Sequence, residues 1–315
     1  IVVMKMNEYL PEGKISSAAA CREYLSDLAG LENAIADDVI LEGKAVLCDS
    51  ERNLHVELGN GLVGIIPPDE CVYDENKSEI KAIAVISRVG KSVCFKVRDI
   101  KSNVYGKTEI ILSRRAAQRE CRQVYISSLK SGDVISAKVT HIEPFGAFVD
   151  IGCGIVSLLS IDCMSVSRIS HPSDRFFVGQ YIKAVVRQPT DEYGRITLSH
   201  RELLGTWEEN AALFGIGQTV TGVVRSIEKY GVFIELTPNL AGLAEYRDGL
   251  EQGDCVSVYI KNILPDKMKI KLVVIDKSEN GRMCGKCNYF YDGEHMEYWR
   301  YSPENSVKLV ETVFA

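Results

Sequence analysis

The sequence lacks any long apolar run. No stretch approaches the roughly 20 apolar residues that a membrane-spanning helix needs, although 46% of the residues are hydrophobic. The chain also does not open on the charged, apolar and small-residue pattern of a secretion signal. We therefore expect a cytoplasmic protein with no membrane contact.

Sequence patterns typical of enzymes are missing as well. There is no phosphate loop ending in Gly-Lys-Ser, no His-Glu-x-x-His pattern and no Gly-x-Ser-x-Gly elbow. The carboxylates are scattered along the expected strands, which is typical of solvated surface residues. We predict that the protein is not an enzyme and that it holds no cofactor and no metal.

The ten cysteines are scattered along the chain and do not form a disulfide framework. Without a secretion signal, reduced thiols are the default. One pair, Cys284 and Cys287, has the spacing of half a zinc site, but a structural zinc site needs four ligands and no second such pair exists. An ordinary turn, a zinc site and a redox pair all remain open interpretations.

Positive charge is also scarce, because the formal net charge is −6. This argues against a nucleic-acid binder, since phosphate contacts need Lys and Arg. However, residues 114–130 carry five basic and one acidic side chain, residues 130–201 carry eight and seven, and residues 216–276 carry seven and eight. The cations should therefore gather on the first two segments, unless those of 114–130 only solvate a helix face.

Two segments of the sequence repeat each other 85 residues apart. Residues 132–139 lead to residues 145–151, and residues 217–224 lead to residues 230–236 at the same offsets. A repeat at a fixed period indicates an array of modules. The many short runs rich in Val and Ile, divided by turns, predict that these modules are built of strands.

Apolar and other side chains alternate along the second strand of each repeat. Ala147, Val149 and Ile151 share one apolar face, because successive side chains on a strand point to opposite sides. Phe148 falls on the other face, beside Asp150. The second copy has the same pattern, so both strands are expected to carry an aromatic ring and a carboxylate on the solvent side.

An aromatic residue, a glycine and a Phe on a solvent-facing strand are typical of a platform on which bases stack. Phe145 and Phe148 form this pattern in the first copy, and Tyr230 and Phe233 form it in the second. The glycine allows a sharp bend and a close approach to the backbone. The alternative is that the rings only cover the end of a small barrel.

Both segments resemble the S-one RNA-binding module of a bacterial small-subunit ribosomal protein and of several RNA-processing enzymes. The resemblance covers residues 130–201 and 217–276, and it includes the Gly opening, the aromatic-Gly-x-Phe strand and, in the second segment, a Gly-Leu turn. In the first segment Asp191, Arg195 and a Leu-Ser ending complete it. The resemblance implies a mainly β fold class: tandem five-stranded Greek-key oligonucleotide-binding (OB-fold) barrels, here joined by short helices.

A weaker copy precedes these two. Residues 54–58 keep the in-out alternation with His55 in the place of Phe148, and residues 61–67 and 110–115 match the turn and the closing strand. The aromatic platform is missing, so we expect this module to serve structure or protein contact. The whole order resembles the shortened S-one homologues of clostridial bacteria.

The resemblance implies further RNA contacts. The family often has a His after the Gly-Leu turn, where this chain has Ser160 in one copy and Glu245, which repels phosphate, in the other. His171, in the longer loop that follows, is expected to supply what Ser160 lacks. The candidate RNA-binding residues are Phe145, Phe148, Ser160, His171, Arg175, Asp191, Arg195, Tyr230, Phe233 and Lys269.

The connectors divide the chain into seven expected segments. These are an N-terminal helical segment (1–41), a degenerate barrel (42–115), a basic linker helix (116–129), an RNA-binding barrel (130–201), a linker helix (202–215), a second RNA-binding barrel (216–276) and a C-terminal hairpin extension (277–315). The first helix should run from Ser16 or Ser17 to Asp37 with one apolar stripe. The hairpin should turn at Asp292, and its aromatic residues either pack on the third barrel or form another stacking surface.

These observations lead to one function and two rivals. We predict binding of single-stranded RNA, as mRNA handled in connection with the small ribosomal subunit. One rival is a protein-interaction array whose platforms bind a protein partner. The other is an accessory subunit of an RNA-processing or metabolic enzyme.

Overall fold

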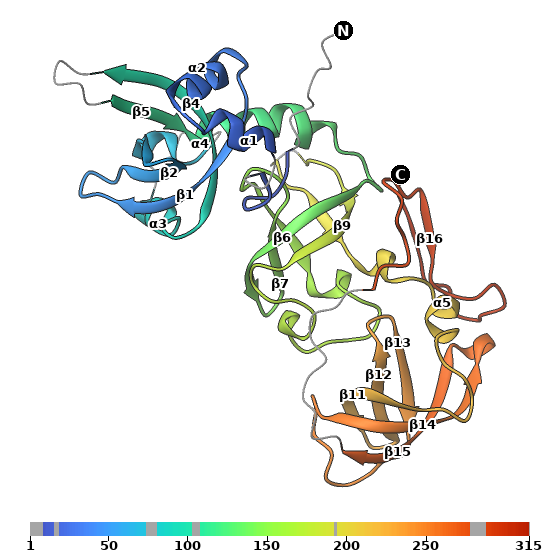
Figure 1. Cartoon of the computed structure of the whole chain (residues 1–315). Helices are drawn as coiled ribbons and strands as arrows, with labels where there is room; N and C mark the ends of the chain where they lie inside the picture. Colours follow the sequence, from blue (N-terminus) through green and yellow to red (C-terminus); the bar gives the residue numbers. More distant parts are fainter. Residues whose placement is uncertain are drawn as a thin grey trace. The chain divides into compact units, whose positions relative to one another are not determined.

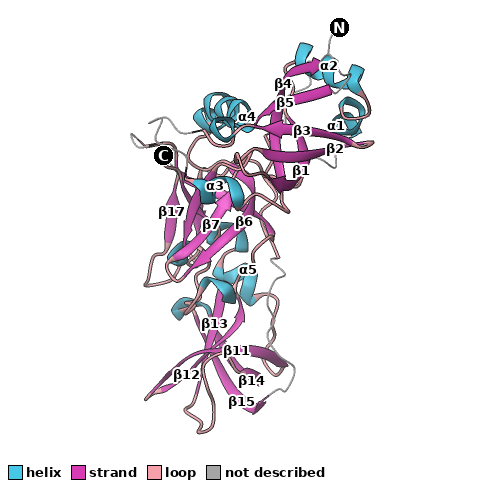
Figure 2. Cartoon of the chain, turned by 90° about the vertical axis from the view of Figure 1, so that its left-hand side faces the viewer, coloured by secondary structure: helices cyan, strands magenta, loops and turns pink. Residues whose placement is uncertain are grey.

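The computed structural model describes residues 9–15, 19–73, 81–102, 108–191, 194–277 and 288–314. The chain divides into two compact units, one made of residues 1–128 with 150–156 and the other of residues 129–149 with 157–315. Strands and loops predominate and the helices are short (Figure 2). Within the described ranges, no helix combines the length and the apolar character that crossing a membrane requires.

Three closed barrels of five strands make up most of the chain (Figure 1). Barrel one contains β1 (Leu41–Cys48), β2 (Leu54–Gly59), β3 (Leu62–Ile66), β4 (Ser92–Ser102) and β5 (Thr108–Ser113). Barrel two contains β6 (Val134–Glu143), β7 (Gly146–Asp150), β8 (Val156–Ser160), β9 (Tyr181–Gln188) and β10 (Thr197–Ser199). Barrel three contains β11 (Thr219–Glu228), β12 (Gly231–Thr237), β13 (Leu240–Ala244), β14 (Cys255–Leu264) and β15 (Lys269–Lys277).

The strand order is the same in all three barrels. The first strand lies between the second and the fourth, and the third strand runs parallel to the fifth. This order is that of the Greek-key oligonucleotide-binding barrel. The predicted fold class is therefore confirmed, including for the degenerate first copy.

The alternation read from the sequence decides what each barrel buries. Ala147, Val149 and Ile151 are at most 1% exposed, as are Val232 and Ile234 in the second copy. The prediction was wrong for the two carboxylates on the opposite faces of these strands, whose burial is described with the site below.

The helices connect or cover the barrels. They are α1 (Ala19–Tyr24), α2 (Leu28–Ala36), α3 (Ala82–Ile86), α4 (Arg114–Glu120) and α5 (Trp207–Ala211). Single turns of tighter or wider helix are η2 (Pro68–Glu70), η3 (Cys121–Tyr125), η4 (Ile126–Ser128), η5 (Ile161–Cys163), η6 (Pro172–Asp174), η7 (Arg201–Leu204) and η8 (Pro265–Lys267).

The long N-terminal helix predicted from the sequence is broken into α1 and α2. Asp27 caps the second helix, because its carboxylate accepts a backbone N–H at 2.7 Å. Beyond the break Leu31 and Ala34 are buried, whereas Leu28 and Ile35 are more than one third exposed. The prediction of one apolar stripe is therefore wrong for Leu28 and Ile35, and the predicted caps, Ser16 or Ser17, lie outside the described residues.

Helical structure runs along the segment predicted as a linker, where α4, η3 and η4 follow one another as far as Ser128. Its first cation is not on the surface. Arg114 is 1% exposed, and its Nε donates to Glu12 at 2.7 Å. The basic surface expected of the linker is therefore weaker than the residue count suggested.

The predicted C-terminal hairpin around Asp292 is wrong. Instead, β16 (Tyr298–Arg300) pairs with β17 (Glu311–Val313), and the backbone near Asp292 bonds to the start of barrel two, where Val134 N–H donates to Glu294 at 2.8 Å. Trp299 and Tyr301 are 5% and 6% exposed and join the core of barrel three. For these two rings, packing rather than base stacking is the correct interpretation.

Candidate nucleic-acid interface

Barrels two and three each present a pair of aromatic rings with the same geometry. The Phe145 and Phe148 centroids are 6.1 Å apart with an angle of 89° between the ring planes, and those of Tyr230 and Phe233 are 6.1 Å apart at 88°. Phe145 is 54% exposed and Tyr230 is 69% exposed. We call these pairs the aromatic platforms of barrels two and three.

The glycine inside each platform is required by a neighbouring strand. A Cβ on Gly146 would lie 2.6 Å from the carbonyl oxygen of Leu159, and one on Gly231 would lie 2.4 Å from that of Ala244. Both distances are too short for real atoms, so only glycine allows this approach. The same approach places Ser160 beside the platform, because its Cα would lie 3.2 Å from the Gly146 Cβ.

A histidine that the sequence reasoning missed extends the platform of barrel two. The His141 ring stacks on Phe148 with centroids 6.3 Å apart and 23° between the planes, and its Nε2 lies 2.6 Å from Glu143 Oε1. His141 follows Thr140 in β6, where the alternation of buried and exposed residues breaks. At the equivalent place in barrel three, before Ser226, the strand register shifts. Such an irregularity re-aims a side chain, and the sequence carries no sign of it.

Asp191 and Arg195 lie together in the loop between β9 and β10. The carboxylate of Asp191 accepts the Arg195 backbone N–H at 2.8 Å and its Nε at 3.0 Å. The Arg195 side chain is 70% exposed and the Asp191 side chain is 40% exposed. The pair holds the guanidinium in a defined place at the surface.

His171 has a local structural role. It caps η6, where its Nδ1 lies 3.2 Å from the Ser173 backbone nitrogen and 2.8 Å from the Ser173 hydroxyl oxygen. These contacts keep the ring within its own loop. Any contact of His171 with RNA remains a prediction.

Arg175 does not lie on the surface as an RNA contact requires. It is 6% exposed, and its Nη1 donates to Glu235 Oε1 at 2.7 Å. The same carboxylate accepts Arg225 Nε at 2.8 Å, and Arg225 Nη1 lies 3.4 Å from Asp174. This buried cluster of two arginines and two carboxylates, the joint cluster, links the η6 loop of barrel two to barrel three. We therefore withdraw Arg175 from the candidate interface.

The joint cluster also explains why Glu235 is buried although it shares a strand face with Phe233. Asp150 holds the equivalent position in barrel two, and it is 2% exposed. Its carboxylate accepts backbone N–H groups of Glu12, Gly152 and Gly154 at 2.7, 2.9 and 3.0 Å. Burial and the nearby Glu12 carboxylate raise the pKa of Asp150 to about 7, whereas these three donors favour its ionised form.

In barrel three the remaining candidates surround the platform less favourably. Lys269 is exposed at the first residue of β15, beyond the turn η8. Glu245 follows β13 and is exposed. This barrel therefore offers aromatic rings with less positive charge beside them.

Comparison with known proteins finds a matching family model and several similar proteins. A family model described as S1 RNA binding domain matches residues 128–201. Small ribosomal subunit protein bS1 of Chlamydia muridarum is 26% identical over 249 residues, 75% of this chain and 40% of that protein. The bS1 homolog of Bacillus subtilis is 31% identical over 237 residues, 70% of this chain and 59% of that protein. By these matches, residues 128–201 are similar to the S1 RNA binding domain, and the chain is similar to bS1 proteins over about 70% of its length.

The chain spans only part of the bS1 relatives that it matches. It covers 40% of the Chlamydia protein, 59% of the Bacillus protein and 46% of bS1 of Leuconostoc lactis, which is 31% identical over 198 residues. Any role of this chain at the level of those whole proteins is therefore a matter for proposal.

The first S1-like barrel has a different surface at the platform position. His55 lies between Leu47 on β1 and Ile65 on β3, and its Nε2 is 3.1 Å from Asp49. A hydrogen bond from Asn53, and a smaller contribution from the hydrogen bond with His55, lower the pKa of Asp49 to about 2. Leu47 is 52% exposed. The face is therefore aliphatic with one fixed imidazole, and it lacks the paired rings of the other barrels.

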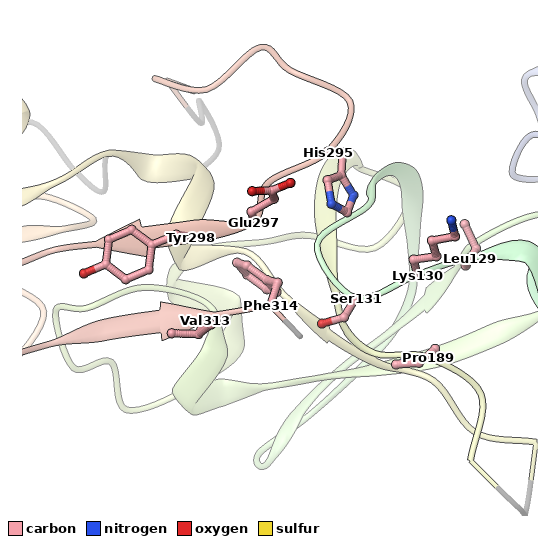
Figure 3. A pocket seen from close by; sticks show the side chains of 9 residues that line it. All are labelled: Leu129, Lys130, Ser131, Pro189, His295, Glu297, Tyr298, Val313 and Phe314. Carbon is pink, nitrogen blue, oxygen red and sulfur yellow. The ribbon is translucent and has the colours of Figure 1, made fainter.

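A shallow pocket of about 680 Å³ lies at the start of barrel two, beside β16 and β17 (Figure 3). Its lining is Leu129, Lys130, Ser131, Pro189, His295, Glu297, Tyr298, Val313 and Phe314. Several of its polar groups already have partners: Tyr298 donates to Glu311 at 2.6 Å, and His295 Nδ1 lies 2.7 Å from Asp133. The rest of the lining combines four apolar residues with Lys130, Ser131 and Glu297.

Within the described ranges, no three His, Cys, Asp or Glu side chains are grouped as a metal site would require. Cys284 and Cys287 lie outside these ranges. The eight other cysteines are free thiols. Burial raises the pKa of Cys94, whose Sγ donates to the Cys153 carbonyl at 3.2 Å, so this thiol is poorly reactive.

Proposed function

We propose that the chain binds single-stranded RNA on the platforms of barrels two and three, and that it acts on mRNA together with the small ribosomal subunit. The observation that carries the RNA proposal is the equal geometry of the two platforms, each with one ring mostly in solvent. A base stacked on such a ring contributes about 1–3 kcal/mol. The ribosomal part rests on the names of the bS1 relatives.

In barrel two the phosphate contact is assigned to Arg195. Its side chain is 70% exposed, and Asp191 holds it in place. Ser160, beside the platform, adds a hydroxyl that can bond to a base or a phosphate. Phosphate contacts release counterions, so binding should weaken as the salt concentration rises.

The three barrels should differ in affinity. Barrel two has His141 and Ser160 beside its rings, and Arg195 is exposed in its β9–β10 loop. In barrel three Glu235 neutralises two arginines and Glu245 is exposed, so its binding should be weaker. Barrel one has no ring pair and should bind RNA least.

For barrel one the aliphatic face around His55 favours the alternative of protein contact. Leu47 and Val63 are 52% and 44% exposed on this face. Apolar side chains gain from leaving water against a protein surface, whereas they give phosphate no partner. For the chain as a whole we propose binding without a catalytic step.

The platform variants Phe148→Ala and Phe233→Ala test the function in the full chain. Fluorescence anisotropy with an unstructured polyuridine RNA should show a loss of affinity of about 5- to 150-fold for Phe148→Ala. The loss for Phe233→Ala should be smaller. Tyr298→Ala, which removes a ring that is 50% exposed on β16, is the control and should bind as well as the parent.

Circular dichroism should show that the variants are folded. If a folded Phe145→Ala/Phe148→Ala double variant binds RNA as tightly as the parent, the platform does not bind bases and the proposal fails. Co-sedimentation of the parent chain with isolated small ribosomal subunits at low salt tests the ribosomal part. Absence of the chain from the pellet would remove that part and leave RNA binding standing.

A further inference from the structure

A second aromatic and cationic surface lies on the outer face of barrel two, where β6 pairs with β9. Along this pair the inward side chains Ile135, Ala137, Val139, Ile182 and Ala184 are buried, with exposures of at most 5%. The side chains between them point outward. They are Ser136, Lys138, Thr140, Tyr181 and Lys183. This outward set contains two cations, one aromatic ring and no carboxylate.

Lys138 and Tyr181 are direct neighbours in this surface. They are cross-strand partners, and the Lys138 Nζ lies over the Tyr181 ring, 5.2 Å from its centroid. Tyr181 keeps 40% of its surface exposed. A cation over one face of the ring holds it in place and is attracted by its π electrons.

This surface is continuous with the aromatic platform. Thr140 is two residues from Lys138, a distance of about 6.6 Å along a strand, and its hydroxyl donates to the carbonyl oxygen of Phe148 at 3.0 Å. The outward side of β6 therefore runs from the backbone of Phe148 to the pair of Lys138 and Tyr181.

We propose that Lys138 and Tyr181 form a second RNA subsite, in which Tyr181 stacks on a base and Lys138 binds a phosphate of the strand that lies on Phe145 and Phe148. The proposal rests on the proposed function, and it adds that barrel two holds a longer piece of RNA than its platform alone.

The charge of the surface favours nucleic acid as the occupant. Lys183 adds a second cation, 3.2 Å from Asp292, a side chain that is 91% exposed. The equivalent place in barrel three has Val223 opposite Cys255, where barrel two has Lys138 opposite Tyr181. The feature therefore belongs to barrel two, the barrel with the better platform, and it does not follow from the barrel fold itself.

Two RNA lengths separate the subsite from the platform. In the full chain, Tyr181→Ala should weaken binding of a polyuridine of about 12 nucleotides roughly tenfold, within the range for one lost stacked base. It should leave a polyuridine of about four nucleotides, which the platform alone can hold, almost unchanged. Lys138→Gln should reduce the slope of log affinity against log salt by about 0.7, the value for one phosphate contact on a single strand.

Two controls accompany these variants. Tyr181→Phe keeps the ring and should keep the affinity. Tyr259→Ala removes a tyrosine that is 38% exposed on β14 of barrel three and should have no effect. In addition, RNA carrying 5-iodouridine should form a photo-crosslink to the tryptic peptide that contains Tyr181.

The outcomes distinguish this inference from the proposed function. If Phe148→Ala weakens both RNAs and Tyr181→Ala weakens neither, the subsite is wrong and the platform stands. If Phe148→Ala weakens neither RNA, the platform is wrong and the subsite, which depends on it, fails as well. Equal losses for Tyr259→Ala and Tyr181→Ala would show a general effect of removing surface rings and would also overturn the subsite.

Discussion

Removal of the charge of Glu235 should lower the free energy of unfolding of the unit that contains barrels two and three. In the joint cluster this carboxylate receives Arg175 Nη1 at 2.7 Å and Arg225 Nε at 2.8 Å. The side chains of Arg175, Glu235 and Arg225 are 5%, 7% and 10% exposed, in that order. Glu235→Gln keeps the shape of the side chain and leaves two buried guanidinium groups facing a neutral amide.

The magnitude follows from the burial. Breaking a buried ion pair by removing one partner costs about 3–5 kcal/mol, because the remaining charge stays buried without compensation. Arg175→Met should cost less, since Glu235 then still accepts two hydrogen bonds from Arg225, at 2.8 and 3.1 Å. Glu228→Gln, at an exposed end of β11, should change the free energy of unfolding by less than about 0.5 kcal/mol.

The chain contains its own probe for this measurement. Its two tryptophans, Trp207 and Trp299, are 2% and 5% exposed in the core of the same unit. Urea unfolding followed by tryptophan fluorescence therefore reports on this unit. If Glu235→Gln costs no more than Glu228→Gln, the cluster contributes as little as a surface pair, and the argument for a buried joint is refuted.

Three further predictions concern stability. Burial lowers the pKa of His200 from 6.5 to about 4, so only the unfolded chain takes up its proton as the pH falls through this range. The contribution of His200 to the free energy of unfolding should therefore drop by about 1 kcal/mol between about pH 7.5 and about pH 5.5. Urea titrations of the parent and of His200→Gln at both pH values measure this contribution as the difference between the two proteins. Gly154→Ala should destabilise the unit that contains barrel one by about 1–3 kcal/mol, because φ is 75° at this residue and the new Cβ would lie 1.9 Å from Arg114 Nη2. Thermal melts followed by circular dichroism measure this loss, and an unchanged melting midpoint would contradict the close contact. Asn239→Ala leaves the carbonyl groups of Arg201 and Gly205 and the N–H of Val166 without their present partner. The free energy of unfolding, measured by tryptophan fluorescence, should fall by about 2–4 kcal/mol. A change near zero would mean that water replaces the side chain.

Local pattern was enough for the strands and for the pairs of aromatic rings. The alternation of Ala147, Phe148 and Val149 has the period of a strand, and this period alone decides which side chain faces the core. The repeat at a fixed offset then carries the same arrangement to Phe233. The resemblance to the S-one module supplied the closing order of the strands, which no single strand contains.

Only the tertiary structure decided the surroundings of these strands. Asp150 and Glu235 lie on faces that the alternation assigns to solvent, and they are buried because Glu12 and Arg175, far away in the sequence, come to cover them. His141 turns outward at the point where the alternation of buried and exposed residues in β6 breaks. A sequence pattern reports the periodicity of one segment, whereas burial and ion pairing at these positions depend on which distant segment packs against it.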